Sequence, residues 1–73
     1  MNLSIAPIGV AMQIVKIRIK DDQKKQLANM GFVDGTPVTV ISENMGNIIV
    51  NVRDSRVGIG KDLAKKINVS PLN

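Results

Sequence analysis

The sequence predicts a small, mainly β domain, built as an SH3-like barrel of about five antiparallel strands. Its 73 residues suffice for one domain and little more. Ten isoleucines and nine valines outnumber four leucines and four alanines, and β-branched side chains favour strands over helices. Several segments also alternate apolar and polar residues, as strands with one buried face do. We therefore treat residues 1–73 as a single barrel domain.

The residue types that are missing restrict the chemistry of the chain. It contains no cysteine and no histidine, so a disulfide framework, a soft-ligand metal site, a cysteine nucleophile and a histidine base are excluded. No glycine-rich phosphate loop precedes a long helix, and the carboxylates lack the spacing of a calcium loop. We therefore expect no enzymatic activity, no catalytic or metal-ligating residues and no cofactor.

The charge pattern favours an ordinary solvated surface over a nucleic-acid interface. The net charge is +4, but acidic residues interrupt the basic ones along the chain. Nucleic-acid binders of this size concentrate their positive charge and add aromatic stacking surfaces, whereas Phe32 is the single aromatic residue here. A small basic β-barrel that binds RNA or DNA is the alternative interpretation. No apolar run is long enough for a transmembrane helix or a signal peptide, so we expect a cytoplasmic protein.

The N-terminal part is predicted to contribute a lead-in segment and the first strand. Residues 1–10 are apolar, and we expect Leu3, Ile5 and Ile8 to cover one end of the core. The first strand is predicted over residues 11–20, where apolar and basic residues alternate. Its inward residues are predicted to be Val15, Ile17 and Ile19.

The outer face of this first strand is basic. Lys16, Arg18 and Lys20 are predicted to lie on it, either as solubilising side chains or as a contact surface for a partner. Ile14 beside Val15 breaks the alternation, which indicates a bend or a β-bulge.

A short helix is predicted to follow and to end at Met30. Asp21 or Asp22 is expected to be its N-cap. Leu27 and Met30, three residues apart, are expected to define the inner face of this helix.

The residues after the helix predict a defined stop and two turns. If Gly31 adopts the left-handed C′ position, Phe32 falls at C″ and Leu27 at C3, the pair that makes the hydrophobic contact of a Schellman motif. Gly35 is expected in a second turn, and Pro37 suits the first position of a strand. Leu27, Gly31, Phe32 and Gly35 are therefore predicted to be structural.

A three-strand meander is predicted next, with a hairpin connection over residues 44–47 and a tighter turn at Asp54-Ser55. Its inward residues are predicted to be Val38, Val40, Ile48, Val50, Val52, Val57 and Ile59. A helical turn over residues 61–66 and a last strand over residues 67–69 complete a closed barrel, because an open sheet this small would have two vulnerable edges.

Two arginines flank the predicted Asp54-Ser55 turn. Arg53 and Arg56 could project from one loop tip and act on a partner's nucleotide site, although solvation of the turn is the simpler interpretation. With Lys16 and Arg18, they are the residues that we expect to contact a partner.

The ordered pattern of residues resembles the FeoA family, small proteins associated with bacterial ferrous iron uptake. Residues 27–35 are similar to the central family signature Leu-x-x-Leu-Gly-hydrophobic-x-x-Gly, with Met30 in place of the second leucine. Further matches are Leu3, Gly9, Ile14, Ile17, Val38-x-Val40, Ile48-x-Val50, Val57-Gly58-Ile59 and Ala64-x-x-Ile67-x-Val69. Gly58 and Gly60 depart from the family pattern, which more often has alanine and a larger residue there.

The resemblance implies an SH3-like barrel that assists FeoB, the membrane Fe(II) transporter that carries a GTPase domain. It also implies that the chain acts by protein–protein contact, without binding nucleic acid and without entering the membrane itself. It does not indicate which surface contacts the transporter or what oligomeric state the chain adopts.

Overall fold

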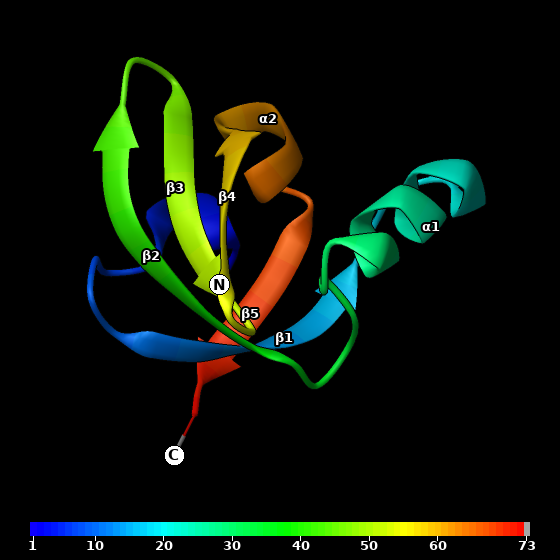
Figure 1. The fold of residues 1–73 in the computed structure, drawn as a ribbon, viewed down its shortest axis with the longest axis horizontal. Coiled ribbons are helices and arrows are strands. Elements are labelled where there is room, and N and C mark those ends of the chain that lie inside the picture. The colour runs from blue at the N-terminus through cyan, green and yellow to red at the C-terminus, as the bar shows by residue number, and fades with distance from the viewer. Residues whose placement is uncertain (73) are drawn as a thin grey trace.

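The computed structural model describes residues 1–72, and a single antiparallel sheet of five strands dominates the fold (Figure 1). The strands are β1 (Ala11–Ile17), β2 (Pro37–Asn44), β3 (Asn47–Val52), β4 (Ser55–Gly60) and β5 (Ile67–Pro71). The helical segments are the 3₁₀ turn η1 (Leu3–Ile5), α1 (Asp21–Asn29) and α2 (Lys61–Ala64). The predicted mainly β fold, with a short helix after the first strand and a helical turn near the C-terminus, is confirmed.

The strands follow the order β4-β3-β2-β1-β5 across the sheet, and every neighbouring pair is antiparallel. The sheet bends strongly, so that β1 and β5 cross below the β2–β3–β4 meander (Figure 1). Hydrogen bonding does not run all the way around, because β4 pairs only with β3. The expectation of a fully closed barrel is therefore wrong, and two edge strands remain.

One hydrophobic core fills the space inside the bent sheet. Each strand contributes inward residues at alternate positions, as the period of two requires. The inward residues predicted for the meander are buried, except that Val57 is only half-buried. Phe32, the single aromatic residue, is 1% exposed and is the largest side chain in this core.

The predicted bend or β-bulge at Ile14-Val15 is confirmed as a β-bulge, which interrupts the alternation along strand β1. Its pairing with β5 shifts register between Ile14 and Lys16, so Val15 is the extra residue. The bulge places Ile14 and Ile17 inside and leaves Val15 54% exposed. The prediction that Val15 faces the core is wrong, and the strand ends at Ile17, three residues earlier than residue 20.

The N-terminal lead-in also packs differently from the prediction. Leu3 is fully buried, whereas Ile5 and Ile8 are 67% and 58% exposed. The 3₁₀ turn η1 rotates Ile5 away from the core, and Ala6 takes the second inward position. The expectation that Ile5 and Ile8 cover the core is therefore wrong.

The prediction that Asp21 or Asp22 is the N-cap of helix α1 is wrong, because the helix itself begins at Asp21. Lys20 occupies the N-cap and makes no side-chain capping bond, while Asp21 and Asp22 lie in the first turn. Their negative charges still stabilise the helix by interacting with the positive end of its dipole. Met30 is the C-cap and is 41% exposed, so the prediction that it shares the inner face with Leu27 is wrong.

Two tight turns connect the strands of the meander. Met45 and Gly46 join β2 to β3 with φ angles of 48° and 84°, the pattern of a type I′ hairpin turn. The β3–β4 turn consists of Arg53 and Asp54, with Val52 paired to Ser55. The predicted position of this turn, at Asp54-Ser55, is one residue too late.

Candidate partner-binding site

The end of helix α1 forms a Schellman motif. The Phe32 N–H donates to the Leu27 carbonyl at 2.9 Å, and the Gly31 N–H donates to the Ala28 carbonyl at 3.0 Å. Gly31 has a φ of +99°, in the left-handed region that favours glycine. Leu27 and Phe32 are both buried in the core. This motif fixes the direction in which the chain leaves α1 toward β2.

Gly35 joins the segment after α1 to strand β1. Its φ is +88°, and its N–H donates to the Ile14 carbonyl at 2.7 Å. The Ile14 N–H in turn donates to the Thr36 carbonyl at 3.0 Å. The connection from α1 to β2 is therefore held at both ends, by the Schellman motif and by these bonds to β1.

Arg53 lies against the end of α1. A Cβ atom built on Gly31 would lie 3.4 Å from the Cδ and 3.6 Å from the Cγ of Arg53, so the aliphatic part of the arginine crosses the glycine. Arg53 itself has a φ of 55°, a conformation that few non-glycine residues adopt. The turn between β3 and β4 is thus packed against the end of α1, and Arg53 is exposed beside it.

The four predicted contact residues do not lie on one element. Arg56 is exposed on β4, opposite Asn51 of β3. Lys16 is exposed on β1, and the Arg18 N–H, just beyond that strand, donates to the Lys66 carbonyl at 2.8 Å. Strands β2 and β3 separate β1 from β4 in the sheet. The structure therefore gives two basic pairs, Lys16 with Arg18 and Arg53 with Arg56.

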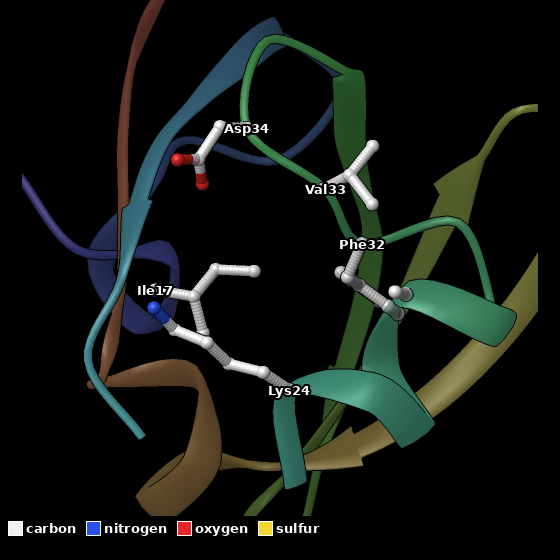
Figure 2. A pocket seen from close by; sticks show the side chains of 6 residues that line it. Ile17, Lys24, Phe32, Val33 and Asp34 are labelled. Carbon is white, nitrogen blue, oxygen red and sulfur yellow. The ribbon is translucent and has the colours of Figure 1, made fainter. Parts of the chain in front are cut away.

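A shallow pocket of about 190 Å³ opens between α1 and β1. Its lining residues are Ile17, Lys24, Ala28, Phe32, Val33 and Asp34. Figure 2 shows the Lys24 ammonium and the Asp34 carboxylate directed toward this hollow, with the apolar side chains around them. Pockets for drug-sized ligands are typically larger, from about 300 Å³, so this one fits a single apolar side chain.

Sequence reasoning did not identify this pocket. Its lining comes from the end of β1, the outer side of α1 and the loop after α1, which are brought together only by the fold. Ala28 is the one local signal, because a small residue on a helix leaves room beside it.

The acidic side chains are dispersed. Within residues 1–72, no group of three or more carboxylates is arranged to hold a metal ion. Glu43 forms an ion pair with Lys61. No helix of the described chain is long and apolar enough to cross a membrane.

We predict that anaerobic titration with Fe(II) or Zn(II) gives weak, scattered chemical-shift changes. The reason is that dispersed carboxylates supply too few ligands for transition metals, which prefer imidazole and thiolate. Calcium at the same concentration is the control, because it distinguishes general carboxylate screening from a transition-metal site. A saturable site with an affinity tighter than about micromolar, as several converging ligands would produce, would contradict this prediction.

The strand order and the short helices are those of a small SH3-like barrel domain. The family model for the FeoA domain matches residues 1–71. The chain therefore belongs to the FeoA family.

Solved structures agree with this assignment. An iron uptake regulatory protein (FeoA) is 33% identical, with a TM-score of 0.88, and the match covers 99% of this chain and 97% of that protein. A Stenotrophomonas maltophilia FeoA complexed with zinc, reported as a prokaryotic SH3 domain protein, is 23% identical over 96% of this chain and 89% of its own, with a TM-score of 0.74. The SH3-like fold is thus confirmed. A search of curated proteins by sequence found no match.

The same fold also occurs in longer chains. Iron(II) transport protein A from Clostridium thermocellum has a TM-score of 0.90 and 23% identity over 99% of this chain, which spans 46% of that protein. The chain thus covers about half the length of that relative. At this level of identity the likeness concerns the fold alone.

Proposed function

We propose that this chain is a cytoplasmic accessory protein of bacterial ferrous iron uptake. It acts by protein–protein contact with FeoB, the membrane Fe(II) transporter, on its cytoplasmic GTPase domain. The observation that carries the proposal is the FeoA-domain match over residues 1–71. The Stenotrophomonas maltophilia relative is itself reported as a candidate activating factor of ferrous iron transport.

The side chains support a role in contact rather than in catalysis. The described residues hold no cluster of metal-ligating groups, and the exposed charged groups are mainly basic, in keeping with the net charge of +4. Basic side chains at an interface steer a protein toward an acidic surface and set its orientation there. We place the contact on the β3–β4 turn, where Arg53 and Arg56 are both exposed.

Charge reversal at this turn tests the contact. The double change Arg53→Glu and Arg56→Glu is expected to weaken binding to the FeoB cytoplasmic domain by at least about tenfold, because close interfacial charge pairs couple by more than about 1.4 kcal/mol. Binding would be measured by calorimetry with and without guanine nucleotide. Thermal unfolding should change little, since both charged groups are exposed.

The matched control changes the other basic pair. Lys16→Glu with Arg18→Glu alters the net charge equally but on β1, so it reports general electrostatic steering. Equal losses from both double variants would show that overall charge, and not the β3–β4 turn, governs binding. If binding survives both and is lost with Met30→Ser, a change at a 41% exposed side chain, the contact surface is the end of α1.

A further inference from the structure

The two edge strands of the sheet, β4 and β5, differ in whether another part of the chain covers their outer edge. The edge of β5 is covered by the N-terminus: the Val69 N–H donates to the Met1 carbonyl at 2.8 Å, and the Met1 ammonium lies 3.4 Å from the Val69 carbonyl. Asn2 and Asn68 form a further β-bridge there. Strand β4 lies at the other end of the strand order, and among residues 1–72 it pairs only with β3 (Figure 1).

The register of the β3–β4 hairpin defines which backbone groups face outward. Val52 and Ser55 flank a two-residue turn, and in such a hairpin the flanking residues exchange hydrogen bonds. The alternation along β4 then directs the N–H and C=O groups of Arg56, Gly58 and Gly60 away from β3. Outside the β3–β4 ladder, no hydrogen bond within residues 1–72 uses the backbone of Arg56 or Gly58.

Of the features that usually limit pairing at an edge strand, β4 has a charged side chain, Arg56, but not the others. Exposed edge strands are commonly interrupted by proline, lysine or a bulge. Strand β4 contains no proline and no lysine, and its pairing with β3 has no register shift. Arg56 and Gly58 are both exposed. An extended segment from another chain can therefore add to β4 as a further strand, as in β-augmentation.

We propose that the outer edge of β4 binds an extended segment of a partner in which an apolar residue lies next to acidic ones. A Cβ on Gly58 would lie 3.3 Å from the Cδ1 of Ile49, so a large apolar side chain opposite this glycine would cover it and reach Ile49. Arg56, two residues away on the same face, would pair with a carboxylate. Half-buried Val57 offers apolar contact on the opposite face.

The charge argues against a second copy of this chain as the occupant. Each copy carries a net charge of +4, so two copies repel each other overall. Like charges at an interface disfavour association. An acidic segment has the complementary charge. That the segment belongs to FeoB rests on the proposed function, whereas its chemistry rests on β4 alone.

The test uses the full chain and two probes. The first is a synthetic peptide with a valine–leucine–valine segment flanked by glutamates, and its control has lysines in place of the glutamates. The second is the FeoB cytoplasmic domain.

Three variants at Gly58 test the role of its backbone N–H. Gly58→Pro removes the outward N–H, which a solvent-facing edge position tolerates. Gly58→Ala retains that N–H and adds a similar Cβ beside Ile49, so it is the matched control. N-methylglycine at the same position, introduced by chemical synthesis, removes the N–H without adding a Cβ if the proline variant does not fold.

We expect the glutamate peptide to shift and protect the Arg56 and Gly58 amides. Binding should be about tenfold weaker for Gly58→Pro than for Gly58→Ala, which shares the added Cβ, and about tenfold weaker for N-methylglycine than for the parent. The inference is overturned if the peptide leaves these amides unaffected, if the lysine peptide binds equally, or if the Gly58 amide becomes protected by self-association of the protein alone. Binding of the peptide but not of the FeoB domain supports the inference and contradicts the proposed function. Binding of the FeoB domain without protection of the β4 amides supports the proposed function and contradicts the inference.

Discussion

Replacement of Phe32 by alanine is expected to leave the chain largely unfolded at 25 °C. Truncation of a buried phenylalanine typically costs about 3–5 kcal/mol, and a single core in a chain below about 80 residues supplies a similar total stability. Phe32 is 1% exposed and is the largest of the fully buried side chains. Far-UV circular dichroism with urea titration would measure the effect, which is expected to abolish the cooperative transition.

Phe32→Leu is the control for this change. It removes the ring but keeps an apolar side chain, so part of the cavity is filled and the chain should still unfold cooperatively at a lower temperature. A Phe32→Ala variant that melts within a few degrees of the parent would show that the core does not depend on this side chain.

Elements whose signals are local could be predicted from the sequence. Glycine residues in left-handed conformations and the strict alternation in β3 are properties of a few consecutive residues. They gave the Schellman geometry at Gly31, the hairpin at Met45-Gly46 and the inward face of β3, and these agree with the hydrogen bonds and burial in the structure.

The predictions that were wrong concern the direction of single side chains, which depends on how the surrounding segment ends or packs. The bulge indicated by Ile14 beside Val15 is confirmed, but which of the two side chains faces the core is set by pairing with β5, more than fifty residues away, and Val15 was wrongly placed inside. Met30 has the right spacing for the inner face of α1, yet the helix ends there and the side chain turns outward. Ile5 is apolar and still exposed, because in the 3₁₀ turn η1 Leu3 faces the core and Ile5 does not.

The candidate site was the least predictable part for the same reason. The basic residues could be identified from composition, but their separation into a β1 pair and a β3–β4 pair follows from the strand order. The open edge of β4 is likewise a property of the whole sheet, since it exists only because β4 and β5 do not pair. Gly58 and Gly60 are the one sequence signal for this edge, because glycine within a strand allows another backbone to approach closely.

Gly31→Ala is expected to lower the free energy of unfolding by about 1–2 kcal/mol from backbone conformation alone, because a Cβ is strained in the left-handed region. Crowding adds to this cost. The new Cβ would lie 3.3 Å from Val52 Cγ2 and 3.4 Å from Arg53 Cδ. The melting temperature should fall by roughly 4–8 °C for each kcal/mol lost in a domain of this size.

Gly9→Ala separates the two contributions to this loss. Gly9 has a φ of +83°, close to the left-handed geometry of Gly31, and a Cβ there would meet nothing within 4 Å. The difference between the two variants therefore measures crowding at the end of α1. Addition of Arg53→Ala to Gly31→Ala should recover part of the crowding cost, a coupling that a double-mutant cycle detects between contacting residues. If Gly31→Ala unfolds at the temperature of the parent, the left-handed cap does not hold this turn, and the packing of the β3–β4 turn against α1 does not depend on the glycine.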